Sequence, residues 1–133
     1  MADLYQVRNG ELVPIMSISQ CMPISGGQFT GGVFETAVNL SASDIDVSAG
    51  TAFVKTLSEA TSFTVSGVPA SAVACFSLVL ANGGDHVVTW PSSFRWTDGT
   101  PPELTPEGTD VLTFLTVNGG ATWYGVPSLQ GAA

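Results

Sequence analysis

Residues 85–125, DHVVTWPSSFRWTDGTPPELTPEGTDVLTFLTVNGGATWYG, decide the fold of this 133-residue chain. Short runs of aromatic and β-branched residues alternate there with clusters of glycine, proline and asparagine, which is the pattern of β-strands joined by turns. The stretch holds all three tryptophans and one of the two tyrosines. Because aromatic side chains bury large apolar areas, we expect the core to be densest here.

Within this stretch, strands are predicted at residues 87–90, 94–96, 110–117 and 121–125. Asn118-Gly119 joins the last two, and this dipeptide favours a two-residue hairpin turn. Pro91 ends the first strand, because proline has no N–H to donate to a sheet. Residues 98–108 contain three prolines and two glycines, so we expect a long exposed loop there.

Earlier in the chain, further strands are predicted at residues 33–39, 44–47, 51–57, 61–66 and 73–80. Alternation places Phe53, Lys55 and Leu57 on one face of their strand. Residues 73–80 are apolar on both faces, which favours a central strand and a buried Cys75. No long helical pattern is visible. The sequence therefore predicts an all-β domain, an antiparallel β-sandwich of the jelly-roll, immunoglobulin-like or tulip-like kind.

Residues 1–32 differ from the rest of the chain. Their apolar run, residues 12–18, contains Pro14, which argues against a helix, and glycine pairs follow it. Such a run cannot bury itself, so we expect an extended N-terminal arm that adds to a neighbouring subunit through backbone hydrogen bonds. An ordinary edge strand is the alternative. The candidate partner-binding residues of the arm are Leu12, Val13, Ile15, Met16 and Ile18. The β-domain is expected over residues 33–125, with a loosely held tail over 126–133.

Composition limits the partners. The chain is 44% hydrophobic and 11% charged, with a net charge of −8 and only Arg8, Lys55 and Arg95 positive. Nucleic-acid binding needs clustered cations, so neither a nucleic acid nor an anionic membrane surface is an expected partner. The scarcity of charge indicates either a surface that meets other proteins or a β-domain that is polar without charge.

The two cysteines, Cys21 and Cys75, make neither a disulfide framework nor a zinc site. The first residues, Met1-Ala2-Asp3, lack the basic start of a signal peptide, and no apolar run approaches the length of a membrane span. We therefore expect synthesis in a cytosol.

Few residues suggest chemistry. His86 is the only histidine, and its neighbour Asp85 points to the opposite face of an extended chain, so a strand-edge histidine is expected rather than a catalytic one. Glu103, Glu107 and Asp110 are either calcium ligands or a solvated acidic loop. No nucleophile elbow, phosphate loop or dinucleotide fingerprint occurs, so no catalytic residue, cofactor or metal is predicted.

The aromatic residues admit two interpretations, a packed core or a platform on which carbohydrate rings stack. Trp96 and Tyr124 lie near predicted loops and are the expected exposed aromatics. The full set is Trp90, Phe94, Trp96, Trp123 and Tyr124.

An ordered series of motifs in this region resembles a module of tailed-bacteriophage virion proteins, which ends many tail fibres and occurs in small head-associated proteins. The motifs are TWP, FRW, DGTPPELT, DVLTF and NGGATWYG, beginning at residues 89, 94, 98, 110 and 118. The similarity continues more weakly back to about residue 44. Fibre proteins carry a shaft before this module, whereas the residues that precede it here leave room only for an arm.

The resemblance implies a virion structural protein rather than an enzyme. Within that class we expect a capsid decoration (cement) protein on the outer head surface, made in the host bacterial cytoplasm, that contacts the major capsid protein and forms a homo-oligomer, by analogy a trimer. The alternative is a tail-fibre or tail-tip protein that binds a host surface receptor. A third interpretation, from a different class, is a small glycan hydrolase that uses Glu103 and Asp110.

Overall fold

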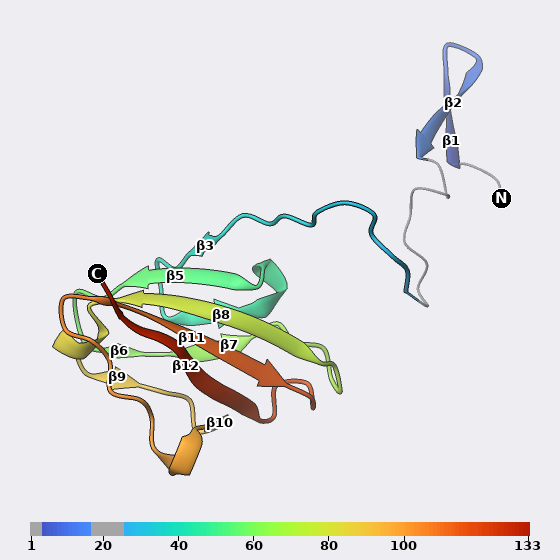
Figure 1. Ribbon diagram of the computed structural model, residues 1–133. Coiled ribbons are helices and arrows are strands. Elements are labelled where there is room, and N and C mark those ends of the chain that lie inside the picture. The colour runs from blue at the N-terminus through green and yellow to red at the C-terminus, as the bar shows by residue number, and fades with distance from the viewer. Residues whose placement is uncertain (1–3, 17–25) are drawn as a thin grey trace. The chain divides into compact units, whose positions relative to one another are not determined.

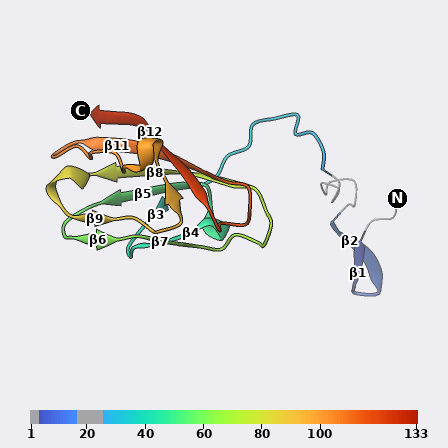
Figure 2. The same cartoon turned by 90° about the horizontal axis from the view of Figure 1, so that it is seen from below.

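The structure is a computed structural model that describes residues 4–16 and 26–133. The chain divides into two compact units, Met1–Phe34 and Glu35–Ala133. Figure 1 labels most of the strands of both units, and Figure 2 adds the label of β4. In residues 4–16 and 26–133 the regular structure consists of strands and short 3-10 turns, so the prediction of an all-β protein is confirmed.

The N-terminal unit contains a β-hairpin. Strands β1 (Leu4–Arg8) and β2 (Glu11–Met16) pair antiparallel, with Arg8 opposite Glu11. Asn9 and Gly10 join them with positive φ angles of 50° and 82°, the backbone that asparagine and glycine adopt most readily in tight hairpin turns. The sequence predicts an extended arm over residues 1–32, and within that range the Asn-Gly turn folds the described residues 4–16 back on themselves.

The C-terminal unit is built on a six-stranded sheet in the order β10-β12-β11-β8-β5-β3. Its strands in chain order are β3 (Val38–Asn39), β5 (Ala52–Thr56), β8 (Ala74–Ala81), β10 (Phe94–Arg95), β11 (Thr109–Thr116) and β12 (Trp123–Ala132). Strand β8 lies between β11 and β5, as the apolar run 73–80 predicted.

The prediction of a purely antiparallel sheet is wrong. Strand β11 pairs antiparallel with β8 and with β12, but β5 is parallel to both β8 and β3, and β10 is parallel to β12. Strands β10 and β12 are parallel because β11, which runs in the opposite direction, lies between them in the chain. For β3, β5 and β8 the reason is that the chain leaves the sheet between successive strands. It forms β4 (Asp44–Asp46) between β3 and β5, and β6 (Thr61–Ser62) and β7 (Thr64–Ser66) between β5 and β8. Each excursion acts as a crossover, which returns the chain in its original direction.

The crossover strands make two small parallel sheets of their own. Strand β4 pairs with β7, and β6 pairs with β9 (Val88–Thr89). The carboxylate of Asp44 accepts hydrogen bonds of 2.7 Å from the hydroxyls of Thr64 and Ser66, which holds β7 in register beside β4. Figure 2 shows these short strands on one side of the large sheet.

One core cluster joins the short strands to the large sheet. Ile45 of β4 and Phe63, between β6 and β7, belong to the same cluster as the inward residues of β5, β8, β11 and β12. Its fully buried members include Phe53, Phe76, Leu78, Leu80, Leu112, Phe114 and Trp123. Aromatic residues of the stretch 85–125 pack closely in this core, with the rings of Phe94 and Phe114 4.7 Å apart.

Two predictions about the chain's end are wrong. The tail expected over residues 126–133 is mostly the second half of β12, which pairs with β11 as far as Ala132. The two-residue turn expected at Asn118-Gly119 is a longer loop, because the side chains of Thr116 and Asn118 bond the loop's own backbone. Gly119 also donates its N–H to the carbonyl of Ala72, which draws the loop onto a neighbouring turn.

Cys75 is exposed rather than buried. The inward side chains of β8, among them Phe76 and Leu78, fill the core, and Cys75 lies on the opposite face of the strand. Likewise only residues 38–39 of the run 33–39 form a strand, and Glu35 instead accepts hydrogen bonds from Thr51.

Candidate functional site

The aromatic residues form a packed cluster rather than a carbohydrate platform. The ring of Trp90 stacks on Phe63 at 5.2 Å and on Phe94 at 5.9 Å. Trp96 packs edge-on against Trp90 at 5.3 Å and is half-buried, and Trp123 is buried against Phe76. Trp90 is half-buried, so its ring packs on both phenylalanines while part of it also borders an open hollow.

Tyr124 is the exception, with 53% of its surface exposed. It follows the buried Trp123 on β12, so it points to the opposite face of the sheet. Of the two aromatics expected to be exposed, the structure therefore exposes Tyr124 and half-buries Trp96, because Trp96 packs against the ring of Phe114 at 5.6 Å.

Asp110 is the centre of a hydrogen-bond cluster. Its carboxylate is fully buried and accepts bonds from the N–H and hydroxyl of Thr105, both at 2.7 Å, and from the N–H of Gly131 at 3.0 Å. Burial raises the pKa of the Asp110 carboxyl, but these donated bonds outweigh burial and hold the pKa below its ordinary value of 3.8. The carboxylate thus joins the proline-rich loop to the start of β11 and the end of β12, which lie side by side.

The three carboxylates considered as calcium ligands have different environments. Glu103 and Glu107 are exposed, whereas the oxygens of Asp110 are already occupied by protein donors. The described part of the chain contains no group of three or more carboxylate, histidine or cysteine side chains placed to hold a metal ion.

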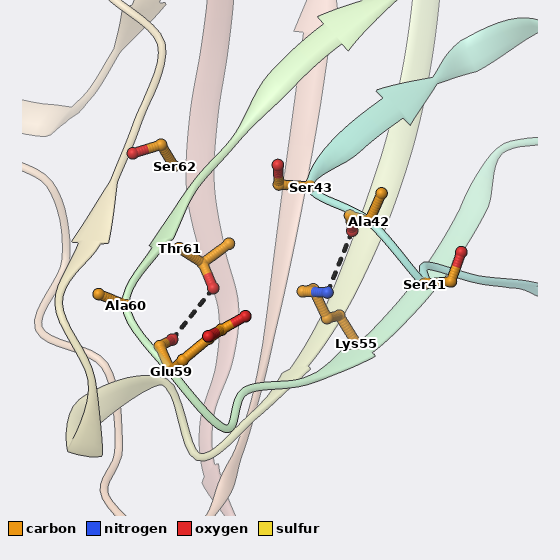
Figure 3. Close-up of a pocket in the computed structure, with 8 residues that line it drawn as sticks. All are labelled: Ser41, Ala42, Ser43, Lys55, Glu59, Ala60, Thr61 and Ser62. Carbon is orange, nitrogen blue, oxygen red and sulfur yellow. Dashed lines mark hydrogen bonds between the residues drawn. The ribbon is translucent and has the colours of Figure 1, made fainter.

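A polar hollow of about 270 Å³ lies beside β5 (Figure 3). Its walls are Ser41, Ala42, Ser43, Lys55, Glu59, Ala60, Thr61 and Ser62. The ammonium of Lys55 donates to the carbonyls of Leu40 and Ala42 at 3.3 and 3.0 Å, so it ties the loop before β4 to β5. Neither histidine nor cysteine lines this hollow, and its one cation is engaged in structural bonds.

A second, open hollow of about 460 Å³ brings together His86, Trp90 and Glu103. His86 follows the turn η3 (Gly83–Asp85) and donates its backbone N–H to Gly83. Asp110, the other carboxylate of the hydrolase interpretation, does not line this hollow. The two carboxylates named for hydrolysis are therefore not brought to one pocket.

The feature that sequence reasoning missed is the outer face of the large sheet, which is the face opposite the core. On β11 the residues alternate strictly, with Leu112 and Phe114 buried and Leu115 pointing outward. Register places Leu115 beside both Tyr124 of β12 and Cys75 of β8. The main exposed or partly exposed residues of this outer face are Cys75, Val79, Leu115, Tyr124, Val126 and Leu129.

The sequence contained a signal for this face. Residues 73–80 are apolar on both faces, and this pattern predicts a central strand whose two faces, that of Cys75 included, are buried. The structure buries only one of them, so the second apolar face remains on the surface of the unit.

The candidate arm residues lie at the other end of the chain. Leu12, Val13, Ile15 and Met16 fall within the hairpin strand β2, and Ile18 lies outside the described residues. Among the described residues, no helix is long and apolar enough to cross a membrane.

Comparison with known proteins adds no relative. No protein family matches this chain, and neither a curated protein nor a solved structure is detectably similar to it.

Proposed function

We propose that this protein is a bacteriophage virion structural protein, and specifically a capsid decoration protein that binds and stabilises the outer head shell. The observation that carries the proposal is that the phage-like motifs, which are separated in the sequence, meet in one connected unit of the structure.

The contacts between motifs are specific. Asp110, which begins the DVLTF motif, bonds Thr105, which ends the proline-rich motif. Trp90 of the TWP motif and Trp96 of the FRW motif both pack near Phe114. A side chain at Gly125, the last residue of the NGGATWYG motif, would collide with Phe114 and Trp96, because a Cβ there would lie 2.7 and 2.8 Å from their rings.

The proposal includes a β-sandwich architecture, in which the short strands form the second layer over the large sheet. The single core cluster shared by both sets of strands supports it. It also includes a binding role for the N-terminal unit as an arm.

Two observations support the arm. The hairpin β1–β2 belongs to a unit of its own, and an isolated two-stranded hairpin is marginally stable in water. Its apolar side chains therefore need a partner surface, which the assembled shell or a neighbouring protomer supplies. A protein that binds only the assembled shell stabilises that shell by mass action.

The copy number in the virion tests the proposal. Quantitative mass spectrometry of purified virions against the major capsid protein should find copies on the order of hundreds, as the repeated symmetry sites of a shell require. A count of a few to a few dozen contradicts decoration and favours the tail.

Deletion of residues 2–24 tests the arm. The truncated protein should no longer bind undecorated heads, which are heads assembled without the full-length protein. It should keep the tryptophan fluorescence of the folded C-terminal unit. If the truncated protein still decorates heads, the arm is not the binding element.

A tail-fibre or tail-tip protein that binds a host receptor is the second candidate. The exposed Tyr124 beside Arg95, its neighbour across β10 and β12, favours it, since tyrosine and arginine are common anchors of recognition surfaces. This candidate predicts low copy number and loss of host adsorption in Tyr124→Ala virions.

A further inference from the structure

The outer face of the large sheet carries no charge on its four central strands. The outward side chains of β5, β8, β11 and β12 are aliphatic, hydroxyl, thiol, amide or tyrosine groups. Charged side chains stand at the edges of the sheet: Arg95 is on the edge strand β10, and the carboxylate of Glu35 accepts bonds from Thr51, just before β5. By contrast, the unit Glu35–Ala133 contains nine carboxylates and two cations in all.

The carboxylates lie elsewhere. Asp44 and Asp46 are on β4, Asp110 is buried, and the others stand in loops or before β3. Two copies of an acidic chain repel one another through any surface that carries these groups. The outer face is the broad surface through which two copies can approach without bringing carboxylates together.

The size of the face suits such a contact. Strands about 4.8 Å apart, with a rise of about 3.4 Å per residue, give four strands of this length an area of roughly 500 Å² in plan. Corrugation by side chains increases the accessible area above that figure. Weak interfaces bury less than about 600 Å² on each partner and standard ones about 800 Å². The face is therefore large enough for a pair that forms at moderate concentration.

We propose that a second copy of this chain packs on the outer face, with the outer faces of the two copies in contact about a two-fold axis. Leu115, Tyr124, Val126 and Leu129 then lie at the centre of the contact, where large apolar side chains contribute most. This inference does not depend on a role in a virion, because the purified protein in solution tests it.

Cys75 provides a direct probe. It lies on the outer face beside Leu115 and is exposed when the face is uncovered. A full-length Cys21→Ser variant leaves Cys75 as the only thiol, since the chain has two cysteines. Sedimentation equilibrium should show a dimer that dissociates on dilution, and a maleimide should modify Cys75 slowly in the dimer and rapidly after dilution.

Val126→Asp, added to the Cys21→Ser variant, places two like charges across the two-fold axis of the dimer. Because like-charge contacts cost several kcal/mol, dimer affinity should fall by about a hundredfold or more, and Cys75 should become reactive at every concentration. Val87→Asp is the matched control, because Val87 is 71% exposed and precedes β9, away from the outer face. It should dimerise like the parent, and unchanged tryptophan fluorescence in both variants shows that they fold.

Four outcomes overturn the proposal. A monomer with reactive Cys75 means that nothing covers the face, and a monomer with protected Cys75 means that the chain's own N-terminal unit covers it. An oligomer that Val126→Asp leaves intact, or a trimer, means that copies meet through another surface.

Discussion

Asp110 shows how one residue can link segments that the sequence keeps apart. Its carboxylate accepts three hydrogen bonds, from Thr105 five residues earlier and from Gly131 twenty-one residues later. The sequence places an aspartate at the start of a strand and favours a solvated carboxylate over a calcium ligand. The structural role of Asp110 depends on β12 lying beside β11, because the N–H of Gly131 in β12 is one of the three donors to its carboxylate.

Replacement of Asp110 by asparagine should destabilise the protein. An asparagine presents one oxygen in place of two, and its NH₂ group faces the donors of Thr105 or Gly131. We expect the free energy of unfolding to fall by about 2–4 kcal/mol, which urea unfolding followed by tryptophan fluorescence measures. Glu103→Gln, at an exposed position, is the matched control and should change stability by less than about 0.5 kcal/mol.

The same carboxyl predicts how stability depends on pH. Its pKa in the folded protein lies below the ordinary value of 3.8, so the unfolded chain binds the proton more readily. The stabilisation is therefore complete above that ordinary value and is lost as the pH falls through the folded-state pKa. The difference in unfolding free energy between the parent and Asp110→Asn should shrink as the pH is lowered below 3.8, and a constant difference would contradict this.

At the scale of elements, strand positions could be predicted but strand directions could not. Residues 44–47, 51–57, 61–66 and 110–117 were predicted as strands, and β4, β5, β6 with β7, and β11 lie within or nearly within them. Alternation of apolar residues acts locally and reveals such strands. Whether β5 runs parallel to β8 depends on where the intervening chain crosses, which is a property of the packed core rather than of either strand.

The turn η3 illustrates an element whose position depends on a single glycine. Gly84 donates its N–H to the carbonyl of Thr105, and a Cβ at Gly84 would lie 2.3 Å from the carbonyl oxygen of Leu104. Gly84→Ala should therefore push the turn from the proline-rich loop and lower the unfolding free energy by about 1–3 kcal/mol.

Gly31→Ala is the control for this prediction, because a Cβ there would meet no atom within 4 Å. Its unfolding curve should match that of the parent. Equal stability of the two alanine variants would mean that the backbone of the turn relaxes without cost.

At the scale of the whole molecule, the two units should differ in what they contribute to stability. All buried hydrophobic residues of the described core lie between Ile45 and Trp123, within the C-terminal unit. Removal of residues 1–34 should therefore leave the urea midpoint of tryptophan fluorescence unchanged. Phe76→Ala in the full-length chain is the positive control, because it opens a cavity beside Phe114 and Trp123. It should lower the unfolding free energy by about 3–5 kcal/mol, which shows that the assay reports on the core.

A lower midpoint on removal of residues 1–34 would mean that the N-terminal unit packs against the core unit and is not an independent arm. The trimer expected from the phage resemblance rests on analogy alone. The uncharged outer face of the sheet favours a two-fold pair instead, and the sedimentation experiment separates the two.

The sequence by itself determined the all-β class, the places of most strands and the aromatic core, because alternation, turn residues and aromatic content act over short distances. The tertiary structure decided the rest. It buried Asp110 under donors from distant segments, stacked Trp90 on two phenylalanines, and placed Cys75 and Leu115 on the face of the sheet opposite the core. These outcomes depend on which surfaces meet across the fold, and a local pattern that is apolar on both faces cannot say which face the core will cover.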